Sequence, residues 1–378
     1  MNHPPDYPDY ADIHRARWRR WWVALPVILF LSAMATMLLW PEGKPTRTPS
    51  FWFWSLALPL LLWLIAVAGR WLVWLVALYN RNTYRETIAE SLNSWWRYRS
   101  RSLPVEQVLL VTPLGDEDAD HESLLSSSLP PTPLQGTDAT GNTLLRCSQV
   151  LGMQSRPVLL ARYLARRLLT HLRQNDEARP VQTFCWLGDD DSLAAFTQAL
   201  ESEGIRLPED VIRLFDAGEL DKVIDAVPQD EQALMLCAGC GEGVPDTGSV
   251  AGEGAFAWLC GHQAQAHLHR AEILNPDAGE TPQQLTAQLS RYALLNAAPE
   301  RVLAADKTAM DTLLPSGWSA VDHVLTPWLG HAGTVTAFIV LSLAAQSARN
   351  GQSCGWTTPL MGSHLITGVC VPRGNHPH

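Results

Sequence analysis

The sequence predicts an α/β protein in which a hairpin of two transmembrane helices precedes a soluble, layered α/β domain. Two stretches, 21–40 and 51–69, are apolar and carry no charged residue. Each is long enough to cross a hydrocarbon core of about 30 Å as a helix, which satisfies its backbone groups internally. After residue 104, short apolar runs alternate with amphipathic segments, an order typical of a layered domain. We expect five parts, namely a cytoplasmic segment (1–20), two transmembrane helices with a short external loop (21–79), a juxtamembrane helical linker (80–103), the α/β domain (104–372) and a disordered tail (373–378).

Basic residues set the expected orientation of the hairpin. The loop between the two spans carries only Lys44 and Arg47, whereas many more arginines lie outside the spans. The positive-inside rule therefore puts both chain ends in the cytoplasm, and we expect a multi-pass protein of the bacterial inner membrane with a cytoplasmic soluble domain. The flanking arginines are Arg15, Arg17, Arg19 and Arg20 before the first span, and Arg70, Arg81, Arg85, Arg97, Arg99 and Arg101 after the second.

Two other interpretations of the apolar stretches are weaker. A signal peptide has an apolar region of about 7–15 residues and a small-residue cleavage site, whereas the first stretch is longer and ends in Leu-Leu-Trp-Pro. A pair of buried core helices is apolar on one face, whereas these two stretches are apolar all round. The sequence therefore favours a membrane anchor.

The charge of the chain argues against a nucleic-acid partner. The formal net charge is −10, and the basic residues concentrate near the predicted membrane. We therefore expect the lipid bilayer, and not a nucleic acid, as a partner. The arginines of the linker either approach anionic headgroups or lie on a solvated helix, and the sequence leaves both possibilities open.

The spacing of apolar residues, together with capping and turn-forming residues, predicts the elements of the domain. A leucine stripe (Leu160, Leu164, Leu168) indicates a helix, and the acidic run 189–191 is typical of a helix N-terminus rather than of a cation site. The stretch 116–142, rich in Ser, Pro, Asp and Gly, predicts a long loop. The apolar run 335–345 is too short for a third span and predicts a buried helix. We expect strands at 105–112, 181–187, 232–237, 254–260, 266–274, 301–304, 322–325 and 365–371, and helices at 157–173, 192–204, 281–297 and 333–349.

Seven cysteines lie in a domain that we expect in the cytoplasm, so we predict no disulfides. Cys237, Cys240, Cys260 and His262 form a C-x2-C and a C-x-H pair about twenty residues apart, a spacing that zinc sites use. Against this zinc site, Cys237 and Cys260 end apolar strands, where cysteine is a common buried residue. We expect no cofactor.

Three segments resemble β-ketoacyl synthases and occur in the order of that family. Residues 108–115 (VLLVTPLG) are similar to its opening strand and turn, and residues 250–259 (VAGEGAFAWL) to its Gly-Glu-Gly-Ala strand entry. Residues 329–337 (LGHAGTVTA) resemble the Gly-His-x-x-Gly segment that leads into a long apolar helix. The resemblance implies a thiolase-like fold for most of the domain.

The same resemblance identifies Cys147 and His331 as the candidate catalytic residues. Condensing enzymes of this family use an activated cysteine and two histidines that polarise a thioester carbonyl. The segment that should hold the second histidine reads Ala304-Ala-Asp-Lys-Thr-Ala-Met-Asp311, and Cys147 lacks the Gly-rich turn of a nucleophile. These departures predict a domain without condensing activity.

A catalytically inactive thiolase-like domain that follows a two-helix membrane anchor resembles the adaptor proteins that accompany lipase effectors of bacterial type VI secretion systems. The junction from Trp95 to Val111 looks similar to theirs. The resemblance implies a non-catalytic adaptor that binds a secreted lipase-type effector and helps load it onto the secretion spike. Two alternatives stay open: a membrane-bound β-ketoacyl synthase-like acyl-transfer enzyme, and a zinc-stabilised membrane scaffold.

Overall fold

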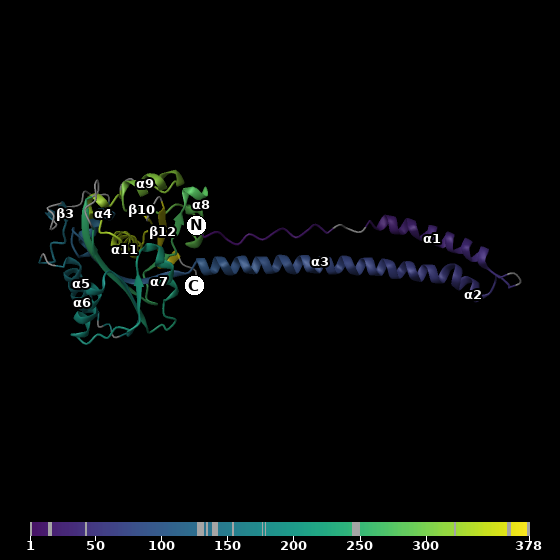
Figure 1. Cartoon of the computed structure of the whole chain (residues 1–378), viewed down its shortest axis with the longest axis horizontal. Helices are drawn as coiled ribbons and strands as arrows, with labels where there is room; N and C mark the ends of the chain where they lie inside the picture. Colours follow the sequence, from purple (N-terminus) through teal and green to yellow (C-terminus); the bar gives the residue numbers. More distant parts are fainter. Residues whose placement is uncertain are drawn as a thin grey trace. The chain divides into compact units, whose positions relative to one another are not determined.

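The computed structural model divides the chain into two compact units, Met1–His3 with Trp96–His378, and Pro4–Trp95 (Figure 1). We describe each unit by itself. The residues that the structure describes are 2–13, 17–41, 44–126, 132–133, 135–137, 143–152, 155–175, 177, 179–243, 250–320, 323–360 and 364–375.

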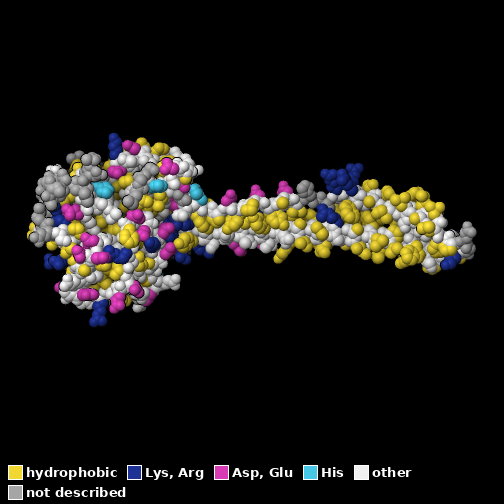
Figure 2. Space-filling view, viewed as in Figure 1, with side chains coloured by type: hydrophobic (Ala, Val, Ile, Leu, Met, Phe, Trp, Pro, Cys, Tyr) yellow, Lys and Arg dark blue, Asp and Glu magenta, His cyan; other side chains and the backbone are white. Residues whose placement is uncertain are grey.

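The unit Pro4–Trp95 is built from apolar helices. Helix α1 (Trp18–Leu39) is followed by the short α2 (Pro49–Trp52), a π-helical turn η1 (Phe53–Ala57) and α3 (Leu58–Arg99), whose last residues belong to the other unit. Hydrophobic side chains make up much of the visible surface of these helices (Figure 2). By length and composition, α1 and the helical stretch Pro49–Arg99 are each able to cross a membrane.

The other unit contains one large mixed sheet, whose main path runs β10-β11-β12-β8-β1-β7-β6-β4-β5. Strands β4, β5 and β6 pair in parallel, as do β10 and β11, and the remaining pairs along the path are antiparallel. The strands are β1 (Ser102–Val111), β2 (Gln135–Thr137), β3 (Thr143–Leu145), β4 (Val181–Leu187), β5 (Val211–Leu214), β6 (Leu234–Glu242), β7 (Ala251–Cys260), β8 (Ala266–His269), β9 (Glu272–Leu274), β10 (Arg301–Ala304), β11 (Cys354–Pro359) and β12 (Leu365–Pro372).

Helices cover both faces of this sheet, so the predicted layered α/β class is confirmed (Figure 1). Alternate residues of β7 show the two layers: Phe256 and Trp258 pack in the cluster around α11, whereas Ala257 packs in the cluster around α5 and α6. The helices are α4 (Asp118–Leu125), α5 (Arg156–Gln174), α6 (Asp190–Glu201), α7 (Leu220–Asp225), α8 (Pro282–Tyr292), α9 (Lys307–Leu313), α10 (Thr326–Leu329) and α11 (Val335–Arg349), with 3-10 turns at Ala217–Glu219, Pro276–Ala278, Leu314–Ser316 and Arg373–Asn375.

The structure corrects several predicted elements. The expected loop 116–142 contains helix α4, which begins with a capping box between Glu117 and Asp120, and strand β2. The expected strand 266–274 is two strands, β8 and β9, and Val324 forms an isolated bridge to Ala304 where we expected the strand 322–325. In the expected disordered tail, residues 373–375 form a 3-10 turn, and 376–378 lie outside the described residues. Strands β5 and β11 were not predicted.

Candidate functional site

The candidate residue His331 lies in a tight turn between α10 and the buried helix α11. The His331 backbone pairs with the start of β7, because its N–H donates to Val250 O (2.8 Å) and its carbonyl accepts from Gly252 N (3.0 Å). The backbone N–H of Gly333 donates to Nδ1 of His331 at 3.2 Å. Nδ1 therefore acts as an acceptor, which leaves the ring proton of a neutral imidazole on Nε2.

Glycine is required where this turn crosses the neighbouring strands. A Cβ at Gly243 would lie 1.6 Å from His331 O, and a Cβ at Gly252 would lie 2.1 Å from Leu329 O. Gly330 has a φ of 71°, in the left-handed region that glycine adopts without strain. Gly243 and Gly252 therefore allow the backbone of the histidine turn to lie close against the sheet.

A cavity of about 370 Å³ lies beside His331. Thr336 and Ala337, in the first turn of α11, line this cavity, and so does Thr358 of β11. The Thr336 hydroxyl accepts from Ala332 N at 2.8 Å, so it fixes the turn as well as lining the cavity. The cavity thus combines an imidazole, hydroxyl groups and apolar surface in one place.

Cys147 lies in different surroundings. Its side chain is 1% exposed and packs with the apolar residues of α5, and burial raises the pKa of its thiol well above the ordinary value. Its backbone N–H donates to Glu253 Oε1 at 2.7 Å. A buried, protonated thiol is a poor nucleophile.

A buried ionic cluster holds the segment that contains Cys147. The Glu253 carboxylate, which has no exposed surface, contacts both Nε (2.9 Å) and Nη2 of Arg156, and Arg146 Nη1 lies 3.5 Å from it. Arg156 Nη1 also donates to the carbonyls of Val150 and Gly152, each at 2.7 Å. This cluster therefore fixes the chain between β3 and α5 near the start of β7.

The structure does not bring Cys147 and His331 together. Cys147 packs in the cluster on the α5 face of the sheet. His331 lines its cavity with Ala217 and Ala337, both of which belong to the cluster on the α11 face. Since the two side chains lie on opposite sides of the sheet, they do not form one catalytic site.

The zinc candidates are also separated. Cys237 packs on the α11 face and Cys240 on the α5 face, because residues an odd number apart on a strand point to opposite sides. Cys260 is buried on the α11 face, whereas His262 is exposed in the following turn. Within the described ranges, no group of three or more His, Cys, Asp or Glu residues is arranged to hold a metal ion. The structure therefore does not bring the four zinc candidates together in one site.

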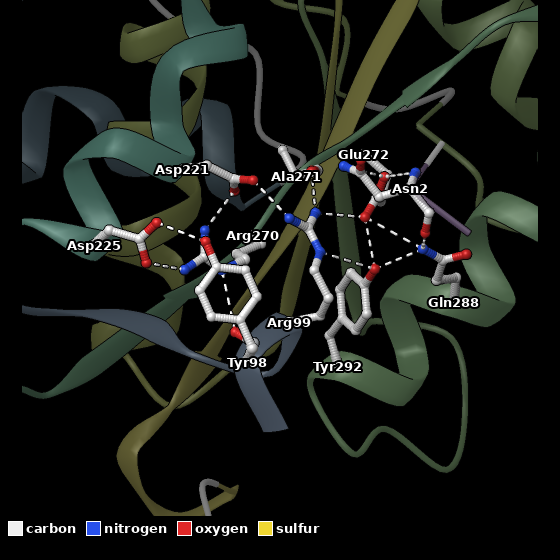
Figure 3. Close-up of polar contacts among 10 residues, drawn as sticks. All are labelled: Asn2, Tyr98, Arg99, Asp221, Asp225, Arg270, Ala271, Glu272, Gln288 and Tyr292. Atoms are coloured by element: carbon white, nitrogen blue, oxygen red, sulfur yellow. Dashed lines mark hydrogen bonds and ion pairs between the residues drawn. The ribbon is translucent and has the colours of Figure 1, made fainter. Parts of the chain in front are cut away.

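A second polar cluster, which sequence reasoning missed, surrounds Arg99 at the end of α3 (Figure 3). Arg99 Nη2 lies 2.5 Å from Glu272 Oε1, and Arg99 Nη1 lies 2.6 Å from Asp221 Oδ2. The Tyr292 hydroxyl donates to the same Glu272 oxygen at 2.6 Å. Burial alone would lower the pKa of Arg99, but Glu272 and its other polar neighbours raise it above the ordinary value.

Arg270 extends this cluster to Tyr98, the residue of α3 that precedes Arg99. The guanidinium of Arg270 is fully buried, pairs with Asp225 and lies 4.3 Å from the ring centre of Tyr98. The Tyr98 hydroxyl donates to the other oxygen of Asp225 at 2.8 Å. Burial alone would raise the pKa of Asp225, but the Arg270 and Tyr98 hydrogen bonds lower it below the ordinary value.

The cluster also holds the N-terminal residues that belong to this unit (Figure 3). The backbone N–H of Asn2 donates to Glu272 Oε2 at 2.7 Å, and Gln288 Nε2 donates to Asn2 O at 2.7 Å. Tyr98 and Arg99, at the end of α3, belong to the same cluster. The cluster therefore acts as a structural anchor for residues 2–3 and 96–99.

Comparison with known proteins finds similarity at the level of the fold. No protein-family model matches the chain, and no curated protein sequence matches it. Among solved structures, the ishigamide ketosynthase/chain length factor is similar with a TM-score of 0.53 and 12% identity, over 72% of this chain and 99% of that chain. OleA of Xanthomonas campestris (TM-score 0.45, 11% identity, 71% and 98%) and an HMG-CoA synthase complexed with CoA (0.43, 10%, 72% and 82%) are also similar. The globular unit therefore has a thiolase-like α/β fold.

Proposed function

We propose that this chain is a membrane-anchored adaptor whose thiolase-like domain binds a protein and does not catalyse acyl transfer. The observation that carries the proposal is the separation of Cys147 from His331 on opposite faces of the sheet. The buried thiol of Cys147, whose pKa burial raises, supports it further. The same fold without a working nucleophile offers a large surface for protein binding.

The membrane anchor is supported by the two long apolar helices. Apolar side chains such as Leu31, Leu38 and Ile65 are more than half exposed, which is costly in water and favourable in lipid. The distribution of arginines around the spans favours insertion with the domain in the cytoplasm. A reporter fused after His378 should therefore report a cytoplasmic location, and a periplasmic signal would reverse this orientation.

The partner that we propose is a secreted lipase-type effector, which the chain helps load onto the spike of a type VI secretion apparatus. This part of the proposal depends on the resemblance of the junction from Trp95 to Val111 to the lipase adaptors. In the structure this junction contains Tyr98 and Arg99, so the junction also has a structural role in anchoring the chain.

The decisive experiment compares binding with catalysis in the full chain. The variant Cys147→Ala/His331→Ala should still co-purify with the effector and support its secretion at the wild-type level. Purified wild-type protein should neither hydrolyse nor condense acyl thioesters above the background of the double variant. Loss of function in the double variant, with unchanged membrane insertion and thermal stability, would contradict the adaptor proposal.

The cavity beside His331 favours one alternative, a membrane-bound acyl-transfer enzyme. An imidazole with a proton on Nε2, next to the hydroxyls of Thr336 and Thr358, provides groups that polarise a carbonyl. This alternative predicts thioester turnover that the single variant His331→Ala abolishes, in the same assay. The zinc-scaffold alternative loses support because Cys240 packs on the opposite face of the sheet from Cys237 and Cys260.

A further inference from the structure

A groove runs between α1 and the first turns of the second helical stretch, within the unit Pro4–Trp95. It encloses about 540 Å³ and is lined by apolar side chains together with Ser32. The groove is bounded by a hydrogen bond at each end: Trp63 Nε1 donates to Trp21 O, and the Ser32 hydroxyl donates to Trp54 O, both at 3.3 Å. The small side chains of Ala24 and Ala66 leave the space between the helices open.

We propose that this groove binds one acyl chain of an anionic phospholipid, whose phosphate lies against the arginines at the end of the groove. The inference rests on the membrane anchor of the proposed function. It names a lipid site on the anchor that is separate from the protein-binding surface of the domain.

The length of the groove matches one leaflet of the membrane. From Trp21 to Ser32 the helix rises about 17 Å at 1.5 Å per residue. Half of a hydrocarbon core of about 30 Å is about 15 Å, so a chain that starts at the headgroups reaches the midplane along this groove. Trp21 begins the apolar stretch and marks the end of the groove at the headgroup level.

The volume favours a hydrocarbon chain over a helix. A helix about 10 Å in diameter and 17 Å long occupies about 1300 Å³, more than the groove holds. A second copy of α1 or a helix of another protein would therefore contact the rim of the groove and leave its floor unfilled. A single acyl chain is narrow enough to enter between the two helices.

Positive charge at the same end selects an anionic headgroup. Arg20 directly precedes Trp21, and Arg70 follows Ala66 by four residues, about one helical turn. Arg19 directly precedes Arg20, and Arg17 lies three residues before Arg20. None of these four arginines makes an ion pair within the part of the chain that the structure describes. Figure 2 shows a cluster of basic side chains at one boundary of the apolar surface. A lipid phosphate would supply the missing negative charge.

Native mass spectrometry of the full chain tests the proposal. The protein is extracted from membranes in mild detergent and offered an equimolar mixture of phosphatidylglycerol and phosphatidylcholine. We expect one retained phosphatidylglycerol per chain. The variant Ala24→Leu/Ala66→Leu, which fills the groove, should lose this lipid, whereas Ala35→Leu, at an exposed position on the same helix outside the groove, should keep it.

A second variant removes positive charge at the end of the groove and leaves the groove itself unfilled, so it tests the headgroup contact separately. Arg20→Gln/Arg70→Gln should lower the preference for phosphatidylglycerol over phosphatidylcholine by about fivefold per arginine, as expected for basic residues near an anionic surface. Arg47→Gln, in the loop at the opposite end of the hairpin, should leave the preference unchanged.

Three results would overturn the inference. Equal lipid retention in the groove-filling variant and in Ala35→Leu would exclude the groove as the site. An unchanged lipid preference in Arg20→Gln/Arg70→Gln would exclude the phosphate contact, and a chain dimer in place of the lipid complex would assign the groove to a second copy. Wild-type protein in the soluble cell fraction would instead overturn the membrane anchor, and with it the proposed function.

Discussion

Arg156 and Glu253 form a buried ion pair in which two nitrogen atoms of the guanidinium contact both oxygens of the carboxylate. Glu253 lies near the start of β7, between Gly252 and Gly254, and Arg156 opens helix α5. Charges are rarely fully buried unless they are paired. The pair therefore links the central sheet to the helix that covers one of its faces.

Removal of one partner of this pair should destabilise the domain strongly. Glu253→Gln leaves the buried guanidinium of Arg156 without a counter-charge, so we expect a loss of about 3–5 kcal/mol in the free energy of unfolding. The measurement is the urea midpoint of the detergent-solubilised full chain. Arg173→Gln is the matched control, because its pair with Glu203 is largely exposed and should contribute less than about 1 kcal/mol. Similar midpoint shifts for the two variants would contradict the prediction.

The glycine turn under His331 gives a second stability prediction. A methyl group at Gly243 would lie 1.6 Å from His331 O, so Gly243→Ala has to displace the backbone of the histidine turn. We expect a loss of about 1–3 kcal/mol, as for other overpacked sites, together with a loss of any ligand bound in the adjacent cavity. The midpoint of thermal unfolding measures the effect. Gly374→Ala, where an added methyl group meets no atom within 4 Å, should leave that midpoint unchanged.

Much of the fold was predictable from local patterns. The strand Val181–Leu187 ends in the buried apolar run 184–187, and helix α5 carries a leucine stripe, so burial agrees with the sequence pattern in both. Helix α4 was missed because its acidic, polar sequence has little apolar periodicity, and the capping box supplies its start. Strand β5 has only four residues, and β11 contains Gly and Pro, so neither carries a clear strand pattern.

The candidate site was less predictable, because it depends on which face of the sheet each residue occupies. The C-x2-C spacing of Cys237 and Cys240 suits a turn, but on a strand it sends the two thiols to opposite faces. Glu253 had a detectable signature, namely one carboxylate within an otherwise apolar strand. Its partner Arg156 could not be identified from the sequence, since nearly a hundred residues separate the two.

Thiol chemistry offers a direct test of the inactive cysteine. All seven cysteines are buried, and burial raises the pKa of Cys147 well above its ordinary value and that of Cys240 to about 12. We expect no labelling of the folded full chain by iodoacetamide at neutral pH and complete labelling after denaturation. Ser202→Cys, at an exposed position after α6, should react at the rate of a free thiol and serves as the control. Fast labelling of Cys147 in the folded state would indicate an accessible nucleophile and favour the enzyme alternative.

His121 should make the stability of the domain depend on pH. Its ring is 1% exposed, its Nε2 lies 3.0 Å from the Thr112 hydroxyl, and burial lowers its pKa below the ordinary value of about 6.5, although nearby carboxylates of α4 oppose this shift. The unfolded chain therefore binds a proton at a higher pH than the folded chain does. The stabilisation is present above about pH 6.5 and is lost as the pH falls toward the pKa of the folded state, by at most about 1.4 kcal/mol per pH unit. In His121→Asn, the free energy of unfolding should be lower at neutral pH but should fall less steeply on acidification, because the titrating group is gone. Urea midpoints of both proteins between about pH 5 and 7 measure the difference in slope, and parallel curves would assign the pH dependence to other groups.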